Sequence, residues 1–201
     1  MSEFRDELDR IVDQINARGH ASILARDPAD HQIMERIIAN YWADAMRTAL
    51  GANITSIRSN PKPYDAPDCF AMYNGKELSI EVTELVDSNI LAKIDKARKV
   101  GRNLTSSREL FDDAQWTAER LRNEIEARLN KKNARYSSKG ESFDVLVIYT
   151  AENWLSPKII ETTLAKSHFA IGDAFKSAYL LSEYYPGYAE HWPLFTPYVT
   201  I

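Results

Sequence analysis

The chain has 201 residues, of which 44% are hydrophobic and 27% charged, and its formal net charge is −4 at pH 7. This composition is typical of a globular domain, and no apolar run approaches the roughly 20 residues that a membrane-spanning helix needs. The single cysteine, Cys69, excludes an internal disulfide and a cysteine-rich zinc site, and the acidic N-terminus is unlike a signal peptide. We therefore expect a cytoplasmic protein with no membrane partner.

Two helices are predicted before the first strand. Residues 3–18 place apolar side chains along one stripe of a short helix, which ends at Gly19. A stronger helix begins with Asp27 as its N-cap and Pro28 in its first position, and it ends at Gly51. We treat the first helix as an addition to the domain and the second as part of its core.

Strands and helices then follow in the mixed order of an α/β fold. The run 143–149 is almost continuously apolar, which indicates a central strand covered on both faces. We expect one domain over 1–201, to which a helix over about 3–18 and an aromatic-rich segment over about 168–201 are added. The predicted elements after the second helix are strands over 52–58, 68–73 and 77–85, helices over 88–100 and 106–133, a strand over 143–149, a helix over 156–166 and a strand over 177–184.

The strands over 68–73 and 77–85 form a predicted β-hairpin. Asn74-Gly75 is the preferred dipeptide of a two-residue type I′ turn, which pairs Tyr73 with Lys76. Counting outward, Asp68 then lies opposite Glu81, and two ionised carboxylates about 5 Å apart repel by about 3 kcal/mol at an effective dielectric near 20. A fold that keeps such a pair usually has a cation between them or one shared proton. The alternative is a solvated strand face with acids placed there by chance.

The apolar pattern of the hairpin supports this register. One face is apolar, as a buried face should be, and the other is mixed, with its polar residues gathered where Asp68, Glu81 and Thr83 meet. A slip of one residue would scramble both faces. The apolar face carries Cys69, Ala71, Tyr73, Leu78, Ile80 and Val82.

Charge and aromatic residues are unevenly distributed. Residues 88–139 hold thirteen Lys or Arg and seven Asp or Glu, a stripe that could follow a phosphate backbone or could be a solvated helix face. The last 33 residues hold nine of the 21 aromatic residues. This segment is either a stacking platform for single-stranded nucleic acid or an aromatic segment packed on the domain or on a second copy in a homodimer.

Several common sites are excluded. The chain has no glycine-rich phosphate loop, no dinucleotide-binding fingerprint and no Gly-x-Ser-x-Gly nucleophile turn. Its four histidines are scattered without metal-ligand spacing.

The element order and the residues Pro67-Asp68 and Glu81-Val82-Thr83 resemble the PD-(D/E)xK nuclease-like superfamily. The resemblance covers residues 27 to about 150 and implies a restriction-endonuclease-like αβββαβ core, with a mixed central sheet flanked by helices. It also implies that Asp68 and Glu81 hold a divalent cation, Mg²⁺ or Mn²⁺, with help from Glu35 in the first core helix. Oxygen ligands of this kind suit such a cation.

The chain departs from the superfamily pattern at the motif lysine, whose position is occupied by Thr83. The resemblance leaves two substitutes open, Lys93 beyond the third strand and Lys132 before the last core strand. The expected function is a metal-dependent nuclease that cleaves DNA or RNA phosphodiester bonds. One alternative is a catalytically inactive relative that binds nucleic acid or a protein partner, and another is an unrelated α/β protein whose acids are structural.

Overall fold

The protein is described by a computed structural model. The predicted helices over 3–18 and 88–100, the latter almost entirely, and the predicted helix starts at Asp27 and Ser106 lie outside the described residues. These comprise 31–62, 65–87, 92, 96, 99, 100, 116–152, 155–170, 172–183, 185, 187–189 and 191–199.

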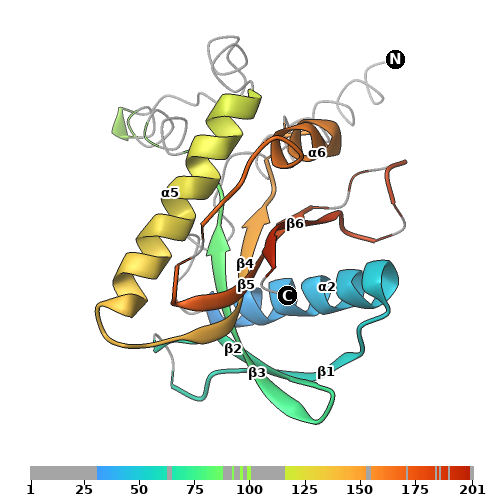
Figure 1. The fold of residues 1–201 in the computed structure, drawn as a ribbon, viewed down its shortest axis with the longest axis vertical. Helices are drawn as coiled ribbons and strands as arrows, with labels where there is room; N and C mark the ends of the chain where they lie inside the picture. Colours follow the sequence, from blue (N-terminus) through green and yellow to red (C-terminus); the bar gives the residue numbers. More distant parts are fainter. Residues whose placement is uncertain are drawn as a thin grey trace.

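The described residues form an α/β fold around a mixed six-stranded sheet with the order β1-β2-β3-β4-β5-β6 (Figure 1). β1, β2 and β3 pair antiparallel, β3, β4 and β5 pair parallel, and β6 returns antiparallel to β5. The strands are β1 (Ile54–Ser59), β2 (Cys69–Tyr73), β3 (Lys76–Glu84), β4 (Phe143–Thr150), β5 (Phe175–Ser182) and β6 (Leu194–Val199).

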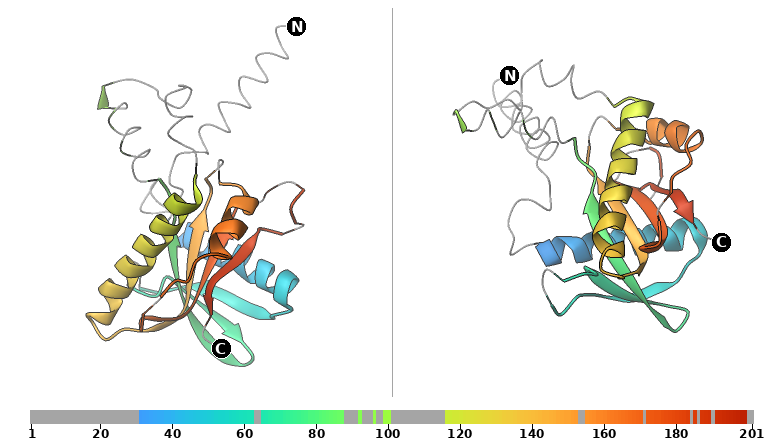
Figure 2. Two further views of the ribbon diagram at one scale, coloured as in Figure 1. Left: turned by 45° about the horizontal axis from the view of Figure 1, so that its top comes forward. Right: turned by 60° about the vertical axis from the view of Figure 1, so that its left-hand side comes forward.

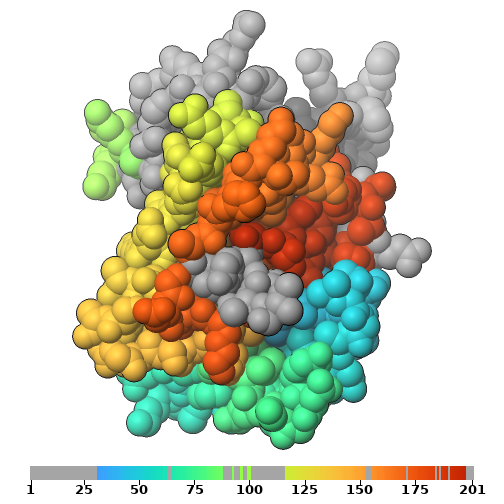
Figure 3. All heavy atoms as spheres, in the orientation of Figure 1, coloured from blue at the N-terminus to red at the C-terminus, as the bar shows by residue number. Residues whose placement is uncertain are grey.

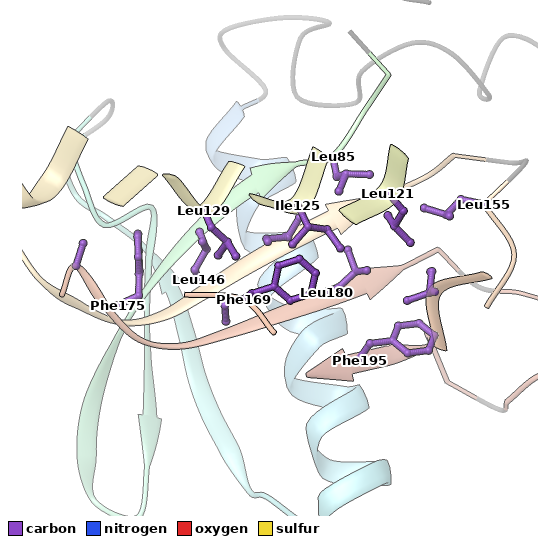
Figure 4. Packing of buried hydrophobic residues seen from close by; sticks show 14 of the residues in the cluster. Leu85, Leu121, Ile125, Leu129, Leu146, Leu155, Phe169, Phe175, Leu180 and Phe195 are labelled. Atoms are coloured by element: carbon purple, nitrogen blue, oxygen red, sulfur yellow. The ribbon is translucent and has the colours of Figure 1, made fainter. Parts of the chain in front are cut away.

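Helices cover both faces of this sheet. α2 (His31–Leu50) buries Trp42 and its neighbours against one face, in a core that includes Ile80 and Val147. α5 (Ala118–Ser137) and α6 (Pro157–Leu164) bury apolar side chains in a second core on the other face. Figure 4 shows this second core between α5 and the strands, with α2 behind the sheet, and Figure 2 shows the same layers from two other directions.

Local sequence signals account for most element ends. Gly51 has φ +67 and its N–H donates to the Arg47 carbonyl at 3.0 Å, so α2 ends where the sequence predicts. Ser156 caps α6, and its side chain accepts from the Ile159 N–H. β4 is central and has strands on both sides, which confirms the prediction from its apolar run.

The structure differs from the predictions at two elements. α5 begins after Thr117, whose side chain accepts from the Arg120 N–H, and it continues to Ser137 instead of ending at Asn133. The C-terminal aromatic segment contributes β6, which includes Pro197 and was not predicted. β6 is an edge strand, where proline is tolerated. None of the described helices has the length and apolarity that a membrane span requires.

The antiparallel strands β1 to β3 lie together at one end of the molecule, next to α2 and the C-terminal end of α5. Figure 3 shows this end in green, with α5 in yellow along one side and α2 in cyan along the other. The predicted hairpin therefore stands where the two helical layers approach the same part of the sheet.

Candidate active site

The β2–β3 hairpin brings Asp68 beside Glu81, as its sequence predicts. Asn74 and Gly75 both have positive φ, +51 and +75, as a type I′ turn requires. The strands pair from Tyr73↔Lys76 out to Cys69↔Ile80, so the next position outward sets Asp68 against Glu81. Asp68 Oδ2 accepts a hydrogen bond from the Val82 N–H at 2.7 Å, which directs this carboxylate onto the backbone of β3.

A hydrogen-bond network around Asn60 holds the loop that leads to Asp68. The Asn60 N–H donates to the Asp68 carbonyl at 2.9 Å, and its side-chain amide donates to the Pro67 carbonyl at 2.8 Å. Gln32 Nε2 of α2 donates to the Asn60 carbonyl at 2.9 Å. The start of β2 is thereby tied to the first turn of α2, the helix segment that also carries Glu35.

Glu81 is buried and is bound by two side chains of α5. Its side chain is 2% exposed, and Lys132 Nζ lies 2.6 Å from Glu81 Oε1. The Tyr136 hydroxyl donates to the same oxygen, and Lys132 Nζ also donates to the Val82 carbonyl at 3.3 Å. The other carboxylate oxygen, Glu81 Oε2, is buried and has no hydrogen-bond partner among the described residues. One oxygen of this carboxylate is therefore held by α5, and the lone pairs of the other are free of any described donor.

The spacing of residues on α5 explains how the helix reaches Glu81. Arg128, Lys132 and Tyr136 are four residues apart and share one helix face. Arg128 donates to the carbonyls of Glu84 and Val86 at 3.1 and 3.0 Å, which aligns α5 along the end of β3.

Aromatic packing holds Tyr136, the last of these three α5 residues, in place. The Tyr136 ring packs edge-on against Phe143 and Phe175, with centroids 4.9 and 5.9 Å away. Burial, together with the Glu81 carboxylate, raises the pKa of Tyr136, so its hydroxyl remains a donor at neutral pH.

Asp68 and Glu35 retain protons to an unusual pH. Burial raises the pKa of Asp68 to about 8, and the charges of Glu81 and Glu35 act in the same direction. Burial also raises the pKa of Glu35 to about 7, with Glu81 contributing and Lys132 opposing. Among the described residues, the site thus holds three carboxylates close enough to perturb one another and one lysine. When all are ionised their net charge is −2, which a divalent cation would balance.

The donor chemistry of the site fits a hard divalent cation, although the side chains do not yet surround one. Carboxylate oxygens suit Mg²⁺, which commonly takes one or two carboxylates and keeps several water ligands. The unpartnered Glu81 Oε2 is such an oxygen. Within the part of the chain that the structure describes, no three Asp, Glu, His or Cys side chains are grouped as a bound metal would require. Of the described side chains, one or two carboxylates would therefore hold the cation, and water would complete its coordination.

The structure places five of the six predicted site residues in this region. Thr83 is half-buried in β3, two positions from Glu81, and therefore faces the same side of the sheet. Of the two candidate lysines, Lys132 contacts Glu81, whereas Lys93 lies outside the described residues. α5 thus places one ammonium group, that of Lys132, against Glu81.

Tyr136 was missed by sequence reasoning. The signal that would have identified it is its spacing of four residues from Lys132 on the same helix.

Cys69 is fully buried, and burial, with Asp68 nearby, raises the pKa of its thiol to about 12. The thiol therefore stays protonated, as a core residue rather than a nucleophile.

Comparison with family models, curated proteins and solved structures found no match to this chain. Function therefore has to be inferred from the chemistry of the site.

Proposed function

We propose that this protein is a divalent-metal-dependent nuclease that cleaves DNA or RNA phosphodiester bonds. The observation that carries the proposal is the grouping of Asp68, Glu81 and Lys132. Asp68 lies beside Glu81 through the hairpin register, and Lys132 Nζ is 2.6 Å from Glu81 Oε1. Two carboxylates and one ammonium group are the parts that a metal-dependent phosphodiesterase needs.

The order of elements supports a restriction-endonuclease-like core of the PD-(D/E)xK superfamily. Helix α2, the meander β1 to β3, helix α5 and strand β4 follow one another as helix, three strands, helix and strand. Asp68 directly precedes the second strand of that order, and Glu81 lies in the third. In this proposal Lys132 takes the role of the motif lysine, which Thr83 cannot perform because it carries no cation.

Each residue has a distinct task in this mechanism. Asp68 and Glu81 Oε2 would hold Mg²⁺ or Mn²⁺, with Glu35 as an additional carboxylate at the edge of the site. The bound ion would supply Lewis-acid chemistry, by lowering the pKa of a water and neutralising charge on the scissile phosphate. Lys132 would direct its ammonium group at the same phosphate, and Tyr136 would hold Glu81 in orientation.

Cleavage assays with matched variants test this proposal. Full-length protein is incubated with labelled single-stranded DNA, double-stranded DNA and RNA in Mg²⁺, Mn²⁺ or EDTA. Asp68→Asn, Glu81→Gln and Lys132→Met should each reduce cleavage about 100-fold or more. Lys131→Met is the control, because Lys131 is the exposed neighbour of Lys132 on α5. Cleavage that persists in EDTA, or equal activity in all variants, would refute the proposal.

A second candidate is a catalytically inactive protein of the same fold that binds nucleic acid or a protein partner. It is favoured by one observation, that Glu81 Oε1 is already occupied by Lys132 and Tyr136. Calorimetric titration with Mn²⁺ separates the two candidates. Tight binding that is lost in Glu81→Ala argues for the enzyme, whereas no binding by the wild type argues for the inactive protein.

A further inference from the structure

Arginines in the described residues fall into two groups, and the smaller group lies at the candidate site. Of the seven described arginines, five form ion pairs with carboxylates. Arg36 and Arg135 form none with any described residue, and both are exposed. The five paired arginines are Arg47, Arg58, Arg120, Arg122 and Arg128.

Both unpaired arginines adjoin residues that build the site. Arg135 Cζ lies 5.3 Å from the centroid of the Tyr136 ring, whose hydroxyl donates to Glu81. Arg36 follows Glu35 on α2 and lies one turn after Gln32 on the same face of that helix. Gln32 Nε2 donates to the Asn60 carbonyl, and the Asn60 N–H donates to the Asp68 carbonyl. One guanidinium thus borders the Glu81 side of the site and the other borders the Asp68 side.

The two arginines come from different layers of the fold. α2 and α5 pack on opposite faces of the sheet and approach the hairpin end from two sides (Figures 1 and 3). An extended polyanion lying across Asp68 and Glu81 would therefore meet a guanidinium group on each side of the carboxylates.

We propose that Arg36 and Arg135 bind the phosphates on either side of the one held at the carboxylate cluster, so that the ligand is a nucleic-acid backbone. A planar guanidinium binds phosphate with two parallel hydrogen bonds, and an arginine without a carboxylate partner need not break an existing pair to do so. Contacts of this kind orient the backbone and do not read sequence. The inference rests on the proposed function and extends it by naming two residues that bind the substrate backbone.

Binding measurements in EDTA test the inference without requiring cleavage. Fluorescence anisotropy of a labelled oligonucleotide is followed at several salt concentrations for Arg36→Gln and Arg135→Gln. Each helix supplies a matched control, Arg47→Gln on α2 and Arg122→Gln on α5, since both control arginines are exposed and already paired. All four substitutions exchange residues of similar helix propensity, so folding should be preserved and is checked by circular dichroism.

Each test variant should bind the oligonucleotide about 5- to 10-fold more weakly, and the slope of log Kd against log salt should fall by roughly one. The controls should stay within about twofold of the wild type. Equal binding by test and control variants would overturn the inference. So would displacement of the oligonucleotide by polyglutamate at equal charge, because that result would indicate an acidic protein as the partner.

The outcomes also separate this inference from the proposed nuclease activity. Arginine-dependent binding without metal-dependent cleavage would leave the inference standing and remove the nuclease assignment. Metal-dependent cleavage, combined with oligonucleotide binding that neither arginine substitution weakens, would overturn the inference and leave the nuclease assignment standing.

Discussion

Replacing Lys132 by methionine should destabilise the protein through the carboxylate that it leaves behind. Lys132 Nζ and Glu81 Oε1 are 2.6 Å apart, and the side chains are 17% and 2% exposed. Two unit charges at that distance attract by about 6 kcal/mol at an effective dielectric of 20. Desolvation of the two ions offsets most of this attraction, so the pair itself adds little.

Breaking such a pair is nevertheless costly, because one charge stays buried. Removal of one partner from a buried pair typically costs about 3–5 kcal/mol. We expect the lower value, about 3 kcal/mol, because the Tyr136 hydroxyl still donates to Glu81 and methionine retains the packing of the lysine stem. For a chain of this size, that loss corresponds to a fall in Tm of about 6–12 °C.

Urea unfolding at pH 8 in EDTA measures the effect directly. Lys131→Met should change the free energy of unfolding by no more than about 0.5 kcal/mol, since Lys131 is exposed. Adding Glu81→Gln to Lys132→Met removes the buried charge, so the double variant should be less destabilised than the two single losses added together. Losses that add fully, or a Lys132→Met effect as small as that of Lys131→Met, would refute the reasoning.

Two further predictions concern the carboxylates and their hydroxyl partner. Burial and neighbouring carboxylates raise the pKa of Asp68 to about 8 and that of Glu35 to about 7, so the folded protein holds protons that the unfolded chain releases near pH 4. Stability in EDTA should therefore fall, on the order of 2 kcal/mol, as pH rises from about 5 to 8, and Mn²⁺ should restore it at pH 8; a flat urea-unfolding profile would contradict this. Tyr136→Phe removes the hydroxyl that donates to Glu81 and should weaken Mn²⁺ binding about 10-fold in calorimetry, whereas Tyr179→Phe, in the opposite core, should not. Equal affinities in these two variants would mean that Tyr136 only fills space.

The hairpin shows how much of the site follows from local sequence. Its turn dipeptide and alternating pattern predict the pairing from Tyr73↔Lys76 to Cys69↔Ile80, and the structure has that pairing. The prediction worked because a two-residue turn and one buried face permit a single register. The opposition of Asp68 and Glu81 follows from the same count.

The partners of Glu81 could not be predicted in the same way. Lys132 and Tyr136 are 51 and 55 residues away in the chain, and their contact with Glu81 depends on how α5 packs across the sheet. From sequence, Lys93 and Lys132 remained equal candidates, because nothing local sets the rotation of a helix against a strand. β6 was missed for a related reason, since an edge strand takes its pairing from β5 and not from its own pattern.

The sequence by itself determined the hairpin, its register, the acidic pair and the order of the described helices and strands from α2 to β5, because these depend on turn chemistry and periodicity over a few residues. Only the tertiary structure decided that Glu81 is buried, that Lys132 and Tyr136 bind one of its oxygens, and that neither Arg36 nor Arg135 forms an ion pair with a described residue. These features arise where two helical layers meet one end of a sheet. Burial and charge pairing depend on how the helices pack against the sheet, and no single segment of the chain encodes them.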